Sequence, residues 1–245
     1  MTDTTPTEDT PIVVLVHGAF VDGSSWGGVI AELKAAGVDV IAPPNMLRGI
    51  GPDAAYLTGL VDALDRPVVL VGHSYGGAVI TQAGADAARV AGLVYVAAFA
   101  PEEGEPLAEI NARYPDVPLA AATRTFNYTN EDGEEATEAF VDRELFRDAV
   151  CADVPEDVAD LLARTQRPAS LNCFGSVLTG TPAWKYLPSW AVVATADRAI
   201  DPAAVRDMAV RAGAEITEVD ASHAVGGSQP SAVADVILQA VKGAP

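Results

Sequence analysis

A serine between two glycines, in the pentapeptide Gly72-His73-Ser74-Tyr75-Gly76, is the part of this chain best suited to chemistry. An apolar run at residues 68–71 leads into it, and a helical pattern of small residues follows it. Glycine has no Cβ atom to collide in a tight bend, so such a serine can sit on a strained strand-to-helix turn. Its hydroxyl is then exposed above the end of a sheet. The pattern predicts Ser74 as a nucleophile; the alternative is an ordinary strand–helix turn that contains a serine.

A serine hydroxyl needs an adjacent base to take its proton, and the chain has 3 histidines to choose from. His73 is next to Ser74 in sequence, so its side chain should diverge from the hydroxyl. His17 follows the first apolar run, where we expect it to shape a loop. His223 follows the last predicted strand, and a loop there can swing over Ser74. We therefore predict His223 as the base, against the alternative of an ordinary surface imidazole.

The acid that orients the base is expected between the serine and the histidine in sequence, just after a strand. Asp197 lies two residues beyond the predicted strand at residues 190–195. Asp201 directly precedes Pro202, which is typical of the start of a helix, so Asp201 is expected to cap that helix. Asp220, near His223 in sequence, is a third candidate. We predict Asp197 as the acid.

An attacked carbonyl becomes an oxyanion, which needs hydrogen-bond donors already in place. One donor is expected to be the backbone N–H of Tyr75, directly after the nucleophile. The other is expected from the loop that Gly18 allows to turn sharply, with Ala19 as the first candidate and Phe20 as the second. The side chains of Phe20, Trp26 and Tyr75 are candidates for an apolar wall, although Trp26 fits core packing equally well.

Six strand-like runs and several helical patterns alternate along the chain. We predict strands at residues 12–16, 38–42, 68–71, 90–96, 190–195 and 216–219, and helices around Trp26–Leu33, 54–64, 203–212 and 231–241. Alternation of this kind predicts a mostly parallel sheet flanked by helices on both faces, with ligands at the carboxyl ends of the strands.

The alternation stops between residues 101 and 188. This stretch has polar turns at 127–135 and helix-like pieces at 138–149 and 155–164. We predict an inserted, mostly helical cap at 101–188 over a core made of residues 11–100 and 189–245. The alternative is a surface excursion without a part in catalysis. Residues 1–10 are polar and acidic, and they are expected to be a disordered lead.

The composition narrows the class of partner. The formal net charge of −19 argues against nucleic acid and against an anionic membrane surface, and no apolar run reaches the length of a membrane span. Two cysteines, Cys151 and Cys173, are too few for a disulfide framework or a metal site. We expect free thiols, no metal, no cofactor and a cytoplasmic protein whose partner is a small-molecule ester. The oligomeric state stays open, a homodimer included.

These features together resemble the α/β-hydrolases. The resemblance rests on His17-Gly18-Ala19-Phe20, on the Ser74 pentapeptide with Gly77, and on Asp197 and His223 in that family's order. Further motifs extend the likeness to a bacterial group similar to plant salicylate-ester esterases and hydroxynitrile lyases: Pro43-Pro44-Asn45-x-Leu47-Arg48-Gly49, the segment 182–190, and Ser222-His223-Ala224-Val225. The resemblance implies an α/β-hydrolase fold and a cofactor-free Ser-His-Asp triad under a small helical cap.

The resemblance favours a carboxylic ester hydrolase that forms an acyl-enzyme on Ser74. Epoxide hydrolases and haloalkane dehalogenases of this fold have aspartate at that position, and rubber-tree-type hydroxynitrile lyases differ at Gly18 and Ala224. A cofactor-free haloperoxidase or perhydrolase, a carbon–carbon bond hydrolase or a lyase uses the same triad, and a ligand-sensing module can retain it. Gly226-Gly227 departs from the bacterial group, where bulkier apolar residues are expected, and this predicts a looser histidine loop or a wider pocket.

Overall fold

Six parallel strands form the central sheet of this computed structural model, which describes residues 10–244. The expected lead at residues 1–10 lies, apart from Thr10, outside the described residues. The strand order is β2-β1-β3-β4-β8-β9, and every neighbouring pair is parallel. The strands are β1 (Ile12–Val16), β2 (Val40–Ile41), β3 (Val68–His73), β4 (Val90–Val96), β8 (Ser189–Ala194) and β9 (Glu215–Val219).

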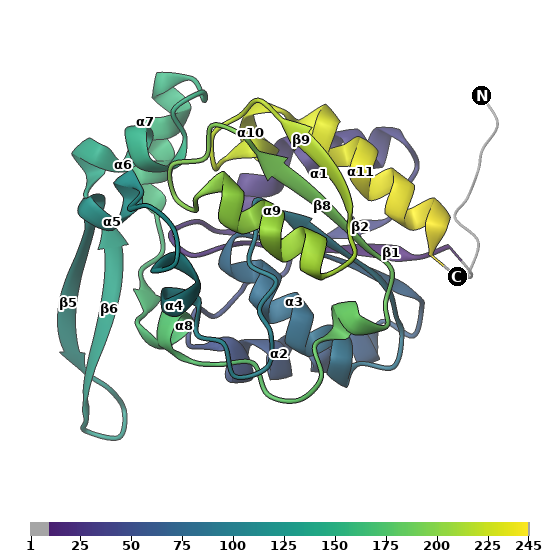
Figure 1. The fold of residues 1–245 in the computed structure, drawn as a ribbon, viewed down its shortest axis with the longest axis horizontal. Coiled ribbons are helices and arrows are strands. Elements are labelled where there is room, and N and C mark those ends of the chain that lie inside the picture. Colours follow the sequence, from purple (N-terminus) through teal and green to yellow (C-terminus); the bar gives the residue numbers. More distant parts are fainter. Residues whose placement is uncertain (1–9, 245) are drawn as a thin grey trace.

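Helices cover both faces of this sheet, as Figure 1 shows. Successive strand residues face opposite sides: Val13 and Leu15 belong to one core cluster, and Val14 and Val16 to the other. The first cluster includes residues of α1 (Gly27–Ala35) and α11 (Pro230–Gly243). The second includes residues of α2 (Ile50–Ala63), α3 (Tyr75–Asp86) and α9 (Pro202–Arg211). The predicted parallel sheet with helices on both faces is therefore present.

The predicted element boundaries agree with the structure to within a few residues. Five strands match closely, while β2 at the sheet edge is shorter than the predicted 38–42. The short 3-10 helix η1 (Gly23–Trp26) leads into α1, which ends before Gly37, a residue with a φ of +78°. Asp201 accepts a hydrogen bond from the N–H of Ala203, so its predicted role as a helix cap is confirmed.

The inserted segment is less helical than predicted. Its helices are α4 (Leu107–Asn111), α5 (Pro118–Ala122), α6 (Arg143–Val150), α7 (Glu156–Thr165), α8 (Asn172–Gly175) and the 3-10 helix η2 (Ala183–Lys185). A three-stranded antiparallel sheet lies among them, made of β5 (Thr123–Thr129), β6 (Glu135–Val141) and β7 (Ala169–Ser170). Figure 1 shows β5 and β6 projecting from one end of the molecule.

The polar turn expected at 127–135 is present but shorter, at residues 130–134 between β5 and β6, and the helix expected to begin at 138 begins at Arg143, after strand β6. Strand β5 is rich in threonine and aromatic residues, which favour strands, but it is mostly exposed and so leaves no apolar run in the sequence. The Phe126 ring packs against those of Tyr128 and Phe140, with centroids 6.4 and 6.1 Å apart.

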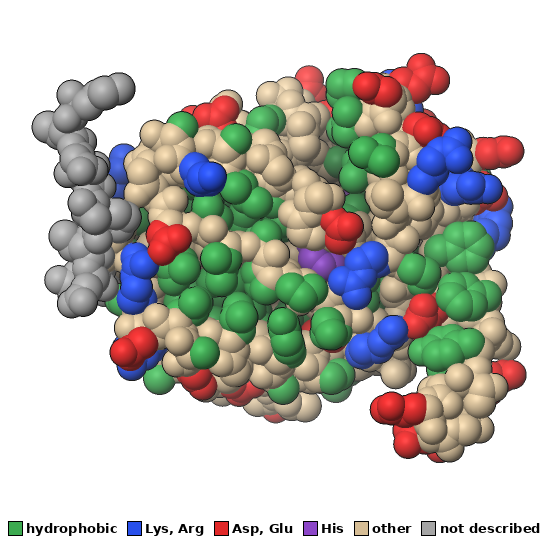
Figure 2. All heavy atoms as spheres, turned by 180° about the vertical axis from the view of Figure 1, so that it is seen from behind, with side chains coloured by type: hydrophobic (Ala, Val, Ile, Leu, Met, Phe, Trp, Pro, Cys, Tyr) green, Lys and Arg blue, Asp and Glu red, His purple; other side chains and the backbone are tan. Residues whose placement is uncertain are grey.

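The surface reflects the composition. Figure 2 shows acidic side chains mostly around the edge of one face, with hydrophobic side chains gathered nearer its middle. Within residues 10–244, no helix combines the length and the apolar character needed to cross a bilayer.

Glycines let α3 pack directly on the sheet. A Cβ atom built on Gly76 would lie 2.5 Å from the carbonyl oxygen of Val16, and one built on Gly77 would lie 2.3 Å from that of Phe99. Real Cβ atoms do not approach backbone oxygens so closely, and therefore these positions admit no side chain without moving the helix.

We expect Gly76→Ala to lower the free energy of unfolding by about 1–3 kcal/mol, the usual range for overpacking. Gly51→Ala in α2 is the matched control, because a Cβ there meets nothing within 4 Å. That change should raise stability by about 0.5–1 kcal/mol, because alanine favours a helix. Urea unfolding measures both, and equal stabilities of the two variants would contradict the packing argument.

Candidate active site

Ser74 sits on the strained turn that the sequence predicts. It joins the end of β3 to the start of α3 with φ 54° and ψ −123°, a conformation that is costly for a residue with a side chain. A Cβ on Gly72 would lie 2.6 Å from the carbonyl carbon of Gly76, so the turn is too tight for larger residues there. The carbonyl oxygen of Ser74 accepts hydrogen bonds from the N–H groups of Gly77 and Phe99.

The structure brings the predicted base and acid together. Nδ1 of His223 donates to Oδ2 of Asp197 over 2.8 Å. The other carboxylate oxygen of Asp197 accepts from the N–H groups of Ala199 (2.7 Å) and Ile200 (3.0 Å), which fixes its orientation. His223 and Asp197 are buried, with relative exposures of 5% and 6%. With Nδ1 committed to Asp197, Nε2 is the ring nitrogen of His223 left for a reacting group.

Ser74 and His223 line the same small cavity, whose volume is about 40 Å³. Ala19 and Phe20, the predicted sources of the second oxyanion donor, line it as well. Phe20 has a φ of 64°. Gly18 lets this loop approach the nucleophile, because a Cβ there would lie 2.7 Å from the Cβ of Ser74.

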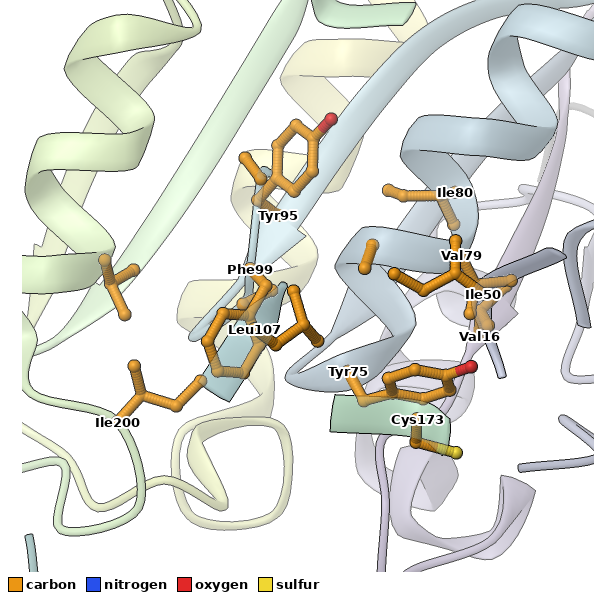
Figure 3. Packing of buried hydrophobic residues seen from close by; sticks show 14 of the residues in the cluster. Val16, Ile50, Tyr75, Val79, Ile80, Tyr95, Phe99, Leu107, Cys173 and Ile200 are labelled. Atoms are coloured by element: carbon orange, nitrogen blue, oxygen red, sulfur yellow. The ribbon is translucent and has the colours of Figure 1, made fainter. Parts of the chain in front are cut away.

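Tyr75 provides the other predicted donor through its backbone, since it is the first residue of α3. The first N–H groups of a helix lack intrahelical partners and carry a partial positive charge. Its side chain turns into the core beside Cys173 (Figure 3), and its hydroxyl donates to Asp53 over 2.7 Å. The expected apolar wall therefore includes Phe20, while the side chains of Tyr75 and Trp26 do not line this cavity.

Asp53 is a buried carboxylate that the sequence analysis missed. Burial raises its pKa, against the hydrogen bonds from Tyr75 and from the N–H groups of Arg48 and Gly49. The sequence does show an acidic residue among the regularly spaced apolar residues of α2. Acidic residues near the start of a helix are common, however, so this one did not indicate a buried carboxylate.

His17 shapes a loop, as expected. Its Nε2 accepts a hydrogen bond from the N–H of Asn45 (2.9 Å), so Nδ1 carries the proton and donates to the carbonyl oxygen of Gly18. The side-chain amide of Asn45 in turn donates to the carbonyl oxygen of His17. The loops after β1 and β2 are tied together next to the cavity, and burial lowers the pKa of His17.

His73 holds the loop of His223, a role that sequence reasoning did not find. Its Nε2–H donates to the carbonyl oxygen of His223 over 2.9 Å, and the two rings lie 4.6 Å apart. Burial lowers the pKa of His73 to about 3, with the neighbouring His223 acting in the same direction. The imidazole is therefore a neutral donor at ordinary pH.

The inserted segment holds the same loop from the other side. The N–H of Ala224 donates to the carbonyl oxygen of Val150, and the N–H of Ser222 donates to the carboxylate of Asp153. The distance from nitrogen to oxygen is 3.0 Å in each. The hydroxyl of Ser222 also bonds to Asp153. Burial works to raise the pKa of Asp153, but these hydrogen bonds outweigh it and keep the pKa below its usual range.

Among residues 10–244, no group of three or more histidine, cysteine or acidic side chains could hold a metal ion. Cys151 and Cys173 are free and buried, and burial raises their pKa values to about 11 and about 12. Both thiols are thus held in their protonated, unreactive form.

Comparison with known proteins identifies a family and similar folds. The sequence pattern of the "Alpha/beta hydrolase family" matches residues 13–236. A carbendazim-hydrolysing esterase from Nocardioides sp. (strain SG-4G) is 38% identical over a segment that covers 38% of this chain. The match spans 44% of that relative's length, which is less than half.

Two solved structures share the fold across nearly the whole chain. Polyneuridine aldehyde esterase superposes with a TM-score of 0.80 at 19% identity, covering 94% of this chain and 99% of that one. A methylesterase from Arabidopsis superposes with a TM-score of 0.78 at 20% identity, covering 95% and 99%. The fold class and the family resemblance predicted from the sequence are confirmed.

Acid should weaken the folded state through His73. The unfolded side chain has a pKa of about 6.5 and the folded one about 3, so between these values the unfolded chain binds a proton that the folded chain does not. Stability is fully present above pH 6.5 and falls as the pH drops, by at most about 1.4 kcal/mol per pH unit for each such group. His17 acts in the same direction.

We expect His73→Gln to reduce the dependence of unfolding free energy on pH by about 1 kcal/mol per unit between pH 6.5 and 5. This pH range lies above the pKa values of the folded-state carboxylates whose pKa is lowered, such as those of Glu105 and Asp153. Urea unfolding at several pH values measures the slope. Identical slopes for the wild type and His73→Gln would show that His73 titrates as in the unfolded chain.

Proposed function

Since the chain belongs to the alpha/beta hydrolase family, we propose that it is a carboxylic ester hydrolase that works through an acyl-enzyme on Ser74. The observation that carries the proposal is the buried Asp197–His223 hydrogen bond at a cavity that Ser74 also lines. A base oriented in this way is what a serine nucleophile requires.

In the first half of the proposed reaction, Oγ of Ser74 attacks the ester carbonyl carbon and its proton passes to Nε2 of His223. The carbonyl oxygen becomes an oxyanion, held by the N–H of Tyr75 and by that of Ala19, with Phe20 as the second candidate. The bond to the alcohol oxygen then breaks, and His223 gives its proton to the leaving alcohol. Asp197 stabilises the imidazolium between these two transfers.

The second half repeats these steps with water. His223 takes a proton from a water molecule, whose oxygen attacks the acyl carbon. The second oxyanion collapses, the bond to Oγ of Ser74 breaks, and the proton returns to that oxygen. An acid and an alcohol are released for each ester and water consumed, and no cofactor is needed.

The surroundings of the triad support a neutral ester. The cavity is lined mainly by apolar side chains and by no lysine or arginine. A lyase that releases cyanide would need a cation near the serine, but Lys185, the one lysine of residues 101–188, forms an ion pair with Glu102 and lies over the Trp184 ring. Its amine is thus occupied away from the cavity, which favours ester hydrolysis over the release of cyanide. The three similar proteins described above are all named as esterases, which also supports ester hydrolysis.

We expect Ser74→Ala to lower the turnover of p-nitrophenyl acetate by about 10³-fold or more, because no other group on the cavity is activated as a nucleophile. Ser231→Ala is the control, since that hydroxyl bonds to Glu32 in another part of the molecule. Its rate should equal that of the wild type. Turnover that survives in Ser74→Ala would remove Ser74 from the mechanism, and an inactive wild type would favour a ligand-sensing module.

Two neighbouring aspartates give a matched test of the acid. Asp197→Asn should lower kcat by about 10²–10⁴-fold, because the imidazole loses both its orientation and its partner charge. Asp201→Asn should keep activity within about twofold, because asparagine also caps helices. Steady-state kinetics with p-nitrophenyl acetate distinguishes them, and the reverse order would identify Asp201 as the acid.

A further inference from the structure

A second apolar pocket, of about 200 Å³, lies beyond the cavity that holds Ser74 and His223. Glycines form one wall, Gly27 and Gly28 at the start of α1 and Gly226 and Gly227 in α10 (Val225–Ser228). Aliphatic side chains of the inserted segment, such as Val154 and Leu162, form the opposite wall. We refer to it as the glycine pocket.

The glycine pocket adjoins the triad. Val21, His73 and Val150 line both the pocket and the Ser74 cavity. A different pocket, of about 440 Å³ between α4, α5 and α8, shares Phe20 and Phe174 with the same cavity. The Ser74 cavity therefore lies between two larger spaces.

The small central cavity limits what can react there. Its volume of about 40 Å³ is much smaller than the volumes of the two adjoining pockets, about 200 Å³ and about 440 Å³. An ester with large groups on both sides of its carbonyl does not fit within this cavity alone. Those groups must lie in the adjoining spaces, one on each side.

We infer that the glycine pocket is a second substrate subsite, which takes an apolar group on one side of the ester while the 440 Å³ pocket takes the other. This inference rests on the proposed function. A cavity of about 150 Å³ is enough for benzene, so the glycine pocket suits a ring of that size or a short alkyl chain. The substrate class is an ester with an apolar group in the glycine pocket; the other pocket, lined by apolar side chains and also by two aspartates, takes the second group.

The lining of the pocket matches such a group. It contains no charged side chain; its polar side chains are Ser24, Ser25 and His73. His73 uses its Nε2–H on the carbonyl oxygen of His223. A carboxylate or ammonium placed here would lose its hydration and gain no charged partner, which disfavours charged groups.

The size of the glycine pocket can be reduced by a substitution at Gly227. A Cβ on Gly227 would meet only the Cγ2 atom of Val154, at 3.9 Å, and the φ of Gly227 suits any residue. Gly226 is less suitable, because a Cβ there would contact the Trp26 ring at 3.4 Å. A larger side chain at position 227 should fill the pocket without displacing backbone.

The test uses esters that vary independently on the two sides: acetyl to octanoyl as the acyl group, and methyl to benzyl as the alcohol. We expect Gly227→Leu to lower kcat/KM by about tenfold or more for the long esters of one series and not of the other. One methylene group in an apolar pocket usually changes kcat/KM by about tenfold or more. Methyl acetate should change by less than about twofold. Gly227→Ala should give a smaller loss in the same series.

Gly51→Leu is the control, because it adds the same side chain to an open helix surface and should leave both series unchanged. Equal falls for methyl acetate and for the long esters, in both Gly227→Leu and Gly227→Ala, would mean that the pocket does not distinguish one substrate group from another, and unchanged rates for every ester would mean that the pocket is not used. Either result overturns the subsite while leaving the ester hydrolase in place. A wild type that hydrolyses no ester would overturn both proposals.

Discussion

The chain packs so closely around Ser74 that three positions, Gly18, Gly72 and Gly76, have no room for a side chain. Cβ atoms on Gly18, Gly72 and Gly76 would each lie 2.5–2.7 Å from another atom of the turn or of β1. This close packing forces Ser74 into its positive φ and holds the loop after β1 against it. The predicted oxyanion donors, on Tyr75 and Ala19, directly follow Ser74 and Gly18, the two residues that this packing brings together. The arrangement is set by the core of the protein and not by adaptable side chains, which is what preorganised stabilisation of an oxyanion requires.

The histidine depends on a wider set of contacts than the serine does. Asp197 fixes the ring through Nδ1, and His73 holds the backbone carbonyl of the same residue. Val150 and Asp153, from the inserted segment, hold the residues on either side of His223. Because His223, the proposed base, is held partly by the insertion, a change in that segment is expected to affect the proposed reaction even where it touches no substrate.

Much of this arrangement could be predicted from the sequence, and the reasons are local. The glycines around Ser74 and the order of Ser74, Asp197 and His223 are features of short segments next to strands. The N–H of Ala203 donates a hydrogen bond to Asp201, which identifies Asp201 as a helix cap and distinguishes it from Asp197, as the Asp-Pro pair indicated. The hairpin of β5 and β6 was not found, because its aromatic side chains are exposed and leave no buried pattern. The role of His73 was missed because its partner lies 150 residues away. The pockets were not predictable either, since their walls combine the core with the insertion.

The most direct measurement of the central claim is to trap the intermediate. The protein is mixed with p-nitrophenyl acetate, quenched in acid within the first turnover, and digested for mass spectrometry. The account predicts a burst of one p-nitrophenol per chain and one acetyl group on the peptide that contains Ser74. An acetyl group on a different residue would contradict the account. Turnover with neither a burst nor an acetyl group on Ser74, even where low pH slows deacylation, would contradict it as well.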